Sequence, residues 1–143
     1  MIAPDVNVLV DVFREDSVHH ARVASWWREE VNGESTIALF ELVLAGFVRV
    51  VTHPRIFARP APLSAALSVV DAHVRQANAM VLRPGARHWG IFARLCAAAD
   101  ARGALVADAY LAALALEHGC AWITSDRDFA RFPGLDWRAP GPH

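Results

Sequence analysis

The sequence predicts a single α/β domain, residues 1–143, with a central and mainly parallel sheet between layers of helices. Short apolar runs alternate with amphipathic stretches along the whole chain, an order typical of parallel strands joined by helices. The length matches one ordinary domain, and 55% hydrophobic residues suffice to bury a core. No signal peptide and no membrane span is evident, so we expect a cytoplasmic protein.

The expected elements follow from hydrophobic spacing. The predicted strands are 2–5, 36–38, 79–82 and 121–123, with a last extended piece at 135–137. The predicted helices are 6–14, 20–31, 39–51, 64–76, 88–101, 107–118 and 126–131. In the first of these helices Val6, Leu9, Val10 and Phe13 recur on one face.

Turn and capping residues mark the ends of these elements. Gly33 ends the second helix, and three prolines exclude a regular helix from the loop 52–62. Ser64 is expected to cap the helix that follows, and Gly119 ends the helix 107–118. The run 105–106 is expected to be a short β-like link, which would place Asp108 in the first turn of its helix.

Four acidic residues stand where the expected strands end. Asp5, Asp108 and Asp126 each lie just beyond a short β-like run, and Glu41 follows the second strand by less than one helical turn. In open α/β sheets this edge is where ligands bind. Crowded carboxylates would have to take up protons unless a divalent cation offsets their charge. The pattern therefore predicts a metal site.

Composition excludes several other chemistries. All 14 basic residues are arginine, and without lysine there is no Walker-A loop, Schiff-base enzyme or response-regulator receiver. The net charge of -1 offers no global attraction to nucleic acid, so RNA binding would need a local patch. Cys96 and Cys120 are too far apart for a metal or redox motif and are expected to be buried, reduced thiols. Oxygen ligands fit Mg²⁺ or Mn²⁺ better than zinc.

Four segments together resemble the PIN-domain ribonucleases, and more narrowly a VapC-type toxin of a type II toxin-antitoxin system. They are Asp5-Val6-Asn7-Val8-Leu9, Glu41, Asp108-Ala109-Tyr110-Leu111-Ala112 and Thr124-Ser125-Asp126-Arg127-Asp128-Phe129. The resemblance covers nearly the whole chain, and the order and spacing of the four segments are specific. Pro4 and Val6 depart from the usual pattern, and Val6 removes a hydroxyl that often supports the first Asp.

The resemblance implies a PIN-like three-layer α/β/α sandwich and a Mg²⁺- or Mn²⁺-dependent endoribonuclease. Asp5, Glu41, Asp108 and Asp126 would be catalytic, with Asp5 and Asp108 as direct metal ligands and Asp126 binding directly or through water. Glu41 would complete the shell or position the attacking water. The supporting residues would be Asn7, Thr124, Ser125 and Asp128. The implied partners are an RNA such as tRNA, a cognate antitoxin and a second copy of the chain.

Simpler explanations exist for individual residues. A lone Asp before a helix is more often an N-cap than a ligand, and Asp128 could serve only to stabilise its helix turn. Asp11, Asp16, Asp71, Asp100 and Asp136 are expected to be solvated surface. Trp26 and Trp27 point about 100° apart on a helix, so one of them is expected to meet a partner.

The arginines are candidates for RNA contacts. Arg14, Arg127 and Arg131 lie near the proposed metal site in sequence and are favoured for phosphate contacts. Arg49, Arg55 and Arg59 surround the proline-rich loop and could contact RNA, an antitoxin or a second protomer.

Two other functions compete with the ribonuclease. The first is a non-catalytic PIN-like module that binds RNA or protein, against which the retained acidic cluster argues. The second is an α/β phosphatase, which usually requires an Asp at position 7 and a lysine, whereas this chain has Asn7 and no lysine.

Overall fold

The computed structural model describes residues 1–141 and contains a five-stranded parallel sheet with the strand order β3-β2-β1-β4-β5. The strands are β1 (Ile2–Pro4), β2 (Ile37–Phe40), β3 (Ala79–Leu82), β4 (Ala121–Ile123) and β5 (Trp137–Arg138). Because all strands run in the same direction, their carboxyl ends meet at one edge of the sheet. The expected mainly parallel sheet is confirmed.

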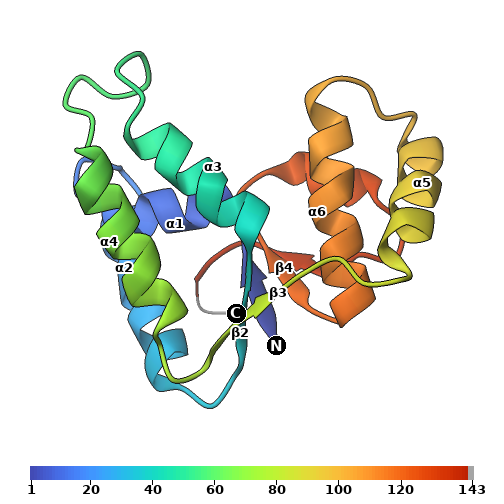
Figure 1. Ribbon diagram of the computed structural model, residues 1–143, viewed down its shortest axis with the longest axis horizontal. Coiled ribbons are helices and arrows are strands. Elements are labelled where there is room, and N and C mark those ends of the chain that lie inside the picture. Colours follow the sequence, from blue (N-terminus) through green and yellow to red (C-terminus); the bar gives the residue numbers. More distant parts are fainter. Residues whose placement is uncertain (142–143) are drawn as a thin grey trace.

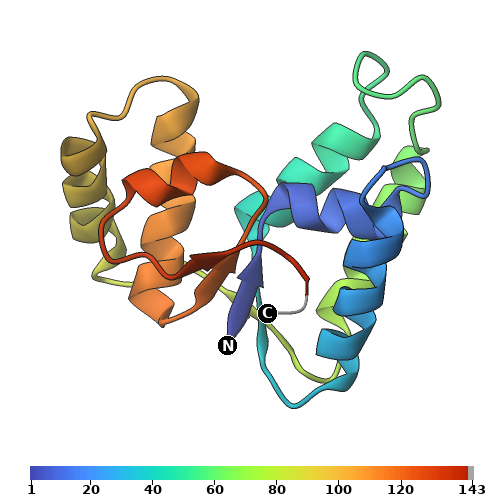
Figure 2. The same cartoon turned by 180° about the vertical axis from the view of Figure 1, so that it is seen from behind.

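Helices cover both faces of the sheet (Figures 1 and 2). On one side lie α1 (Val6–Phe13), α2 (His20–Asn32), α3 (Glu41–Val51) and α4 (Leu63–Val74). On the other lie α5 (His88–Ala99) and α6 (Ala104–His118), and the short 3-10 helix η1 (Arg127–Arg131) packs near α6. This is the expected three-layer α/β/α arrangement.

Aromatic side chains fill the core where the sheet meets the helices. Trp122 on β4 is fully buried, stacks on Phe40 at a ring-centroid distance of 6.0 Å and also contacts Phe129 of η1. Trp26 and Trp27 are both buried as well. The expectation that one of these two meets a partner is wrong, because both side chains are buried, and the Trp27 ring packs edge-on against His73 of α4.

Most predicted elements are present, with three corrections. The helix α6 begins at Ala104, so the expected β-like link 105–106 is its first turn. Pro62, not Ser64, stands at the N-cap of α4, and no side chain caps that helix. The last extended piece forms a fifth strand, in which Trp137 pairs with Trp122 of β4.

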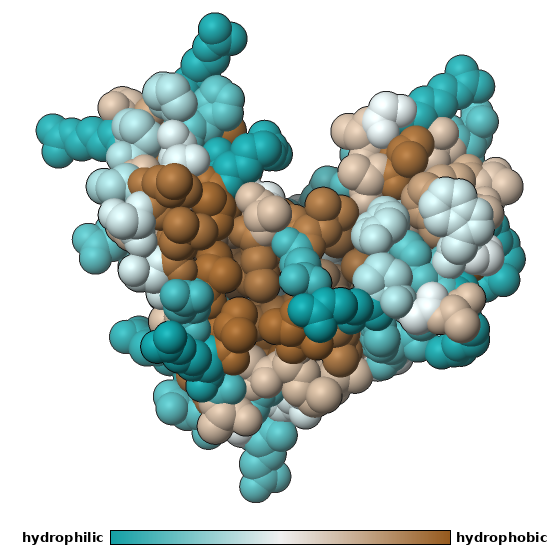
Figure 3. Space-filling view, viewed as in Figure 1, coloured by the Kyte–Doolittle hydropathy of each residue, from teal (hydrophilic) through white to brown (hydrophobic). Residues whose placement is uncertain are grey.

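The two groups of helices leave a hollow at the carboxyl edge of the sheet, and apolar side chains gather along its walls (Figure 3). Among the described residues, no helix is long and apolar enough to cross a membrane.

Candidate metal-dependent active site

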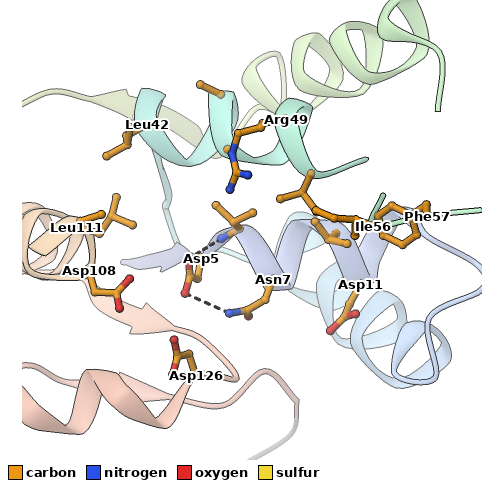
Figure 4. A pocket seen from close by; sticks show the side chains of 16 residues that line it. Asp5, Asn7, Asp11, Leu42, Arg49, Ile56, Phe57, Asp108, Leu111 and Asp126 are labelled. Atoms are coloured by element: carbon orange, nitrogen blue, oxygen red, sulfur yellow. Dashed lines mark hydrogen bonds between the residues drawn. The ribbon is translucent and has the colours of Figure 1, made fainter. Parts of the chain in front are cut away.

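A cavity of about 670 Å³ opens between α1, α3 and α6. Asp5, Asp108 and Asp126 line it, and their carboxylates point toward the same space (Figure 4). These residues come from the end of β1, from α6 and from the segment after β4. The opposite wall is mostly apolar and comes from α3 and the proline-rich loop; it includes Leu42, Val50, Ile56 and Phe57.

Asp5 is held by hydrogen bonds from its own chain. Its Oδ1 accepts a bond from the backbone N–H of Val6 at 2.6 Å, so Asp5 is also the N-cap of α1. Its Oδ2 accepts bonds from Thr124 Oγ1 at 2.7 Å and from Asn7 Nδ2 at 3.2 Å. Burial raises the pKa of Asp5, as does the charge of Asp126, although these three donors act in the opposite direction.

Thr124 joins the first and fourth strands through one buried hydroxyl. It donates to Asp5 Oδ2 and accepts from Asn7 Nδ2 at 3.1 Å and from the backbone N–H of Asp126 at 3.0 Å. The backbone N–H of Ser125 donates to Asn7 Oδ1 at 3.1 Å. The supporting roles expected for Asn7 and Thr124 thus have a geometric basis, while Ser125 takes part through its backbone.

Asp108 lies in the second turn of α6, not in the first turn as expected, because α6 begins at Ala104. Within residues 1–141 no donor forms a hydrogen bond with its carboxylate. Burial raises the pKa of Asp108 to about 6, and the charges of Asp126, Asp5 and Asp128 act in the same direction. Asp108 is therefore the carboxylate of this cavity whose charge the described residues stabilise least.

Asp126 stands at the N-cap of η1, as the sequence predicts. Its Oδ1 accepts a bond from the backbone N–H of Asp128 at 2.9 Å, and its side chain lines the cavity. Asp128 is exposed and its carboxylate lies 3.8 Å from Arg131 Nε. Asp128 thus stabilises the turn and adds negative charge near Asp108 without lining the cavity.

The comparisons with known proteins assign the family. The family model described as PIN domain matches residues 2–135. This chain belongs to the PIN-domain family. It is 45% identical over 140 residues to Ribonuclease VapC43 of Mycobacterium tuberculosis, covering 98% of this chain and 95% of that protein. It is also 40% identical over 135 residues to Ribonuclease VapC25 of the same organism, covering 94% and 95%.

Solved structures agree on the fold of this VapC-family chain. VapBC2 from Rickettsia felis, bound to a DNA fragment from its promoter, matches with a TM-score of 0.73 at 17% identity, covering 97% of this chain and 98% of that one. The sarcin-ricin loop cleaving toxin VapC20 of Mycobacterium tuberculosis matches with a TM-score of 0.70 at 16% identity, covering 96% and 99%. The resemblance stated from the sequence, the PIN-like fold and, at the level of the family, the ribonuclease function are confirmed.

Glu41 is the predicted catalytic residue of this PIN domain that stands apart from the other three. Its side chain is 60% exposed, its Oε1 accepts a 2.7 Å bond from Arg83 Nε, and it does not line the cavity. Its neighbour Leu42 does line the cavity, so Glu41 lies at the rim. Asp11, expected to be plain surface, lines the cavity instead because it lies one helical turn after Asn7 on the same face of α1.

Arg14 is the predicted phosphate contact that the structure contradicts. Its side chain is nearly buried, bonds both oxygens of Asp16 at 2.8 and 2.5 Å, donates to the Arg59 carbonyl and lies over the Phe57 ring. These contacts hold the proline-rich loop and leave no free guanidinium. Arg127 and Arg131 are exposed on η1. Arg49, from α3, extends into the cavity opposite the carboxylates (Figure 4).

The residues present fit a hard divalent cation. Among the described residues, no three His, Cys, Asp or Glu side chains form a cluster that could hold an ion as they stand. Mg²⁺ keeps several waters and commonly binds only one or two carboxylates directly. A set in which Asp5 and Asp108 bind directly and Asp126 binds through water agrees with three carboxylates that line one cavity but do not touch.

Proposed function

We propose that this VapC-family chain is a Mg²⁺- or Mn²⁺-dependent endoribonuclease that acts as the toxin of a toxin-antitoxin pair, with residues 1–143 as one domain. The observation that carries the proposal is the Asp108 carboxylate, which has no donor within residues 1–141 and faces Asp5 and Asp126 across one cavity. A half-buried carboxylate without a donor, next to two others, costs stability unless a cation is bound.

Asp5, Asp108 and Asp126 would hold the ion. When bound, it would make water more acidic and offset charge on the phosphate that is attacked. Asn7 and Thr124 fix the Asp5 carboxylate in one orientation, which is the usual task of residues behind a metal ligand. Ser125 and Asp128 support the same turn through their backbone N–H groups.

Glu41 is proposed to position the attacking water and not to bind the ion directly. Its place at the rim and its pairing with Arg83 support this role. Arg83→Gln would free the Glu41 carboxylate, and Glu41→Gln would remove its charge. If Glu41 acts on water, Glu41→Gln should lower the cleavage rate without weakening Mn²⁺ binding. If Glu41 is a direct metal ligand, Glu41→Gln should lower both the cleavage rate and the affinity for Mn²⁺.

The substrate and partners are proposed on family grounds. Arg127 and Arg131 are proposed to contact RNA phosphates, and structured cellular RNA such as tRNA is the proposed substrate in the cytoplasm. The relatives solved as VapBC support a cognate antitoxin as partner of this chain. Exposed leucines on one face of α4, Leu63 at 60% and Leu67 at 48%, support a homodimer, and Figure 3 shows apolar surface over that side.

The decisive experiment is metal-dependent cleavage of RNA by the purified protein. Wild type should cleave structured RNA with Mg²⁺ or Mn²⁺ and not with EDTA. Asp5→Asn and Asp108→Asn should each remove detectable cleavage while circular dichroism shows the fold retained. Asp71→Asn, an exposed carboxylate on α4, is the matched control and should cleave like wild type.

Two results would contradict the proposal. Undiminished cleavage in both variants would show that these carboxylates do not act. Metal-independent RNA binding by wild type with no cleavage under any ion would indicate the non-catalytic binding module instead.

A further inference from the structure

A second groove, of about 640 Å³, lies next to the catalytic cavity and has the opposite charge. It runs between the start of α2, the 3-10 helix η1 and the strand β5. Arg22, Arg127 and Arg138 line it together with Trp137, Thr124 and Ser125. No carboxylate is among its lining residues, whereas four aspartates and a single arginine line the catalytic cavity.

The two spaces share one wall. Thr124 and Ser125 line the groove, and the Thr124 hydroxyl also bonds Asp5 at 2.7 Å in the catalytic cavity. Asp126 follows directly and lines the cavity. A linear polymer bound in the groove would therefore lie directly beside the carboxylates, with no helix or strand between them.

The three arginines differ in how far the protein already uses them. Arg138 bonds both oxygens of Asp136, at 3.0 and 2.6 Å, and Arg22 donates to the Pro140 carbonyl. These bonds fix the two guanidinium groups at the groove wall. Arg127 is exposed and, within residues 1–141, takes part in no ion pair or side-chain hydrogen bond. Arg127 is thus the side chain of the groove that is free to bind an anion.

We propose that this groove binds the RNA strand on one side of the cleaved bond, with backbone phosphates on Arg127 and Arg22 and a base stacked on Trp137. The proposal rests on the proposed ribonuclease function and names where its substrate lies. A cationic groove with an aromatic ring is the combination that holds single-stranded nucleic acid without reading its sequence. The catalytic cavity also contains an arginine, Arg49, and an aromatic ring, Phe57, but the four aspartates that line it repel phosphate.

Binding without cleavage isolates the groove from the catalytic step. The probe is a fluorescein-labelled single-stranded RNA of about 12 nucleotides, within the site sizes known for such surfaces. With EDTA present, Arg127→Gln should weaken binding about fivefold to tenfold and reduce the slope of log K against log salt by about 0.7, the value for one phosphate contact on a single strand. Arg75→Gln, an exposed arginine at the end of α4, makes the same change in charge and should bind like wild type.

Tryptophan fluorescence tests the stacking contact. RNA should quench the fluorescence of wild type, and Trp137→Phe should remove most of this quenching while a phenyl ring preserves most of the affinity. Trp137→Ala should weaken binding about tenfold, as expected for loss of one stacked base. Trp89 is 71% exposed on α5 and is the matched control, so Trp89→Phe should leave the quenching unchanged.

The outcomes separate this proposal from the ribonuclease itself. If wild type cleaves RNA with Mg²⁺ but Arg127→Gln and Trp137→Ala bind and cleave RNA as wild type does, the groove proposal is overturned and the ribonuclease stands. A groove that serves a protein partner would give this same result. If wild type neither binds nor cleaves RNA, both proposals are overturned.

Discussion

Replacing Asp108 with asparagine should stabilise the ion-free protein even though it removes cleavage. Burial, followed by the charges of Asp126, Asp5 and Asp128, raises the pKa of Asp108 from 3.8 to about 6. By linkage, that rise corresponds to about 3 kcal/mol of unfavourable free energy for the ionised form. Since Asp108 is only half-buried, solvent screening reduces this to about 1–2 kcal/mol.

The sign of the effect fixes its pH dependence. Ionised Asp108 destabilises the fold, so the penalty is fully present above the folded pKa of about 6 and disappears as the pH falls toward the ordinary value of 3.8. Asparagine carries no charge at any of these pH values. The advantage of Asp108→Asn over wild type should therefore be largest near neutral pH and vanish near about pH 4.

Thermal denaturation with EDTA measures this advantage. For a domain of this size, about 1–2 kcal/mol corresponds to a rise in Tm of about 3–8 °C. Glu34→Gln, an exposed acid in the loop before β2, is the matched acid-to-amide control and should not change Tm. Adding Mg²⁺ or Mn²⁺ should raise the Tm of wild type by mass action and affect the variant much less. An Asp108→Asn protein that is no more stable than wild type in EDTA would refute the argument that burial and the neighbouring carboxylates disfavour the ionised Asp108.

Three further variants test other contacts. Thr124→Val removes the three hydrogen bonds of a buried hydroxyl and should lower cleavage about 10–100-fold, whereas Thr124→Ser should restore it; equal rates in both would exclude the positioning role. A Cβ at Gly46 would lie 2.8 Å from Val6 Cγ2, and Val6→Ala would remove this clash. In chemical denaturation, the free energy of unfolding of the double variant Gly46→Ala/Val6→Ala should therefore be about 1 kcal/mol higher than the sum of the effects of the two single substitutions predicts. Burial lowers the pKa of His73, and among the described residues neither of its ring nitrogens has a hydrogen-bond partner. The stability of wild type should therefore fall as the pH drops below 6.5, and His73→Leu should gain relative to wild type from pH 8 to about pH 5.5.

Part of the site can be predicted from the sequence, because the parallel strands determine where the residues that follow them lie. Asp5 and Asp126 follow β1 and β4, which are neighbours in register, with Pro4 opposite Ile123. Carboxylates that follow such a pair of strands must lie near each other. Thr124, the first residue after β4, then falls within reach of Asp5. For these residues, hydrophobic patterning and strand order determine where the side chains lie in the site.

The rest depends on long-range contacts that no local pattern encodes. The helix α3 begins at Glu41, two residues later than expected, and Arg83, forty-two positions later in the chain, bonds its carboxylate at the rim. Arg14 is buried because the proline-rich loop folds back over it, through Arg59 and Phe57. Asp11 could have been found by its spacing of four residues from Asn7, since α1 places both on the face that lines the cavity.

The contrast between Asp5 and Asp108 links the ion to the substrate. Asp5 has three donors from the chain and is fixed whether or not an ion is present, whereas Asp108 has none among residues 1–141. Without an ion the cavity repels phosphate, while the neighbouring groove with Arg127 attracts it. On the proposed function, RNA would occupy the groove in the absence of metal, and its backbone would enter the cavity only once a cation has offset the carboxylates. Metal should therefore change the cleavage rate far more than the affinity for RNA, and an affinity that rises in parallel with the rate would place the main RNA contacts in the cavity instead.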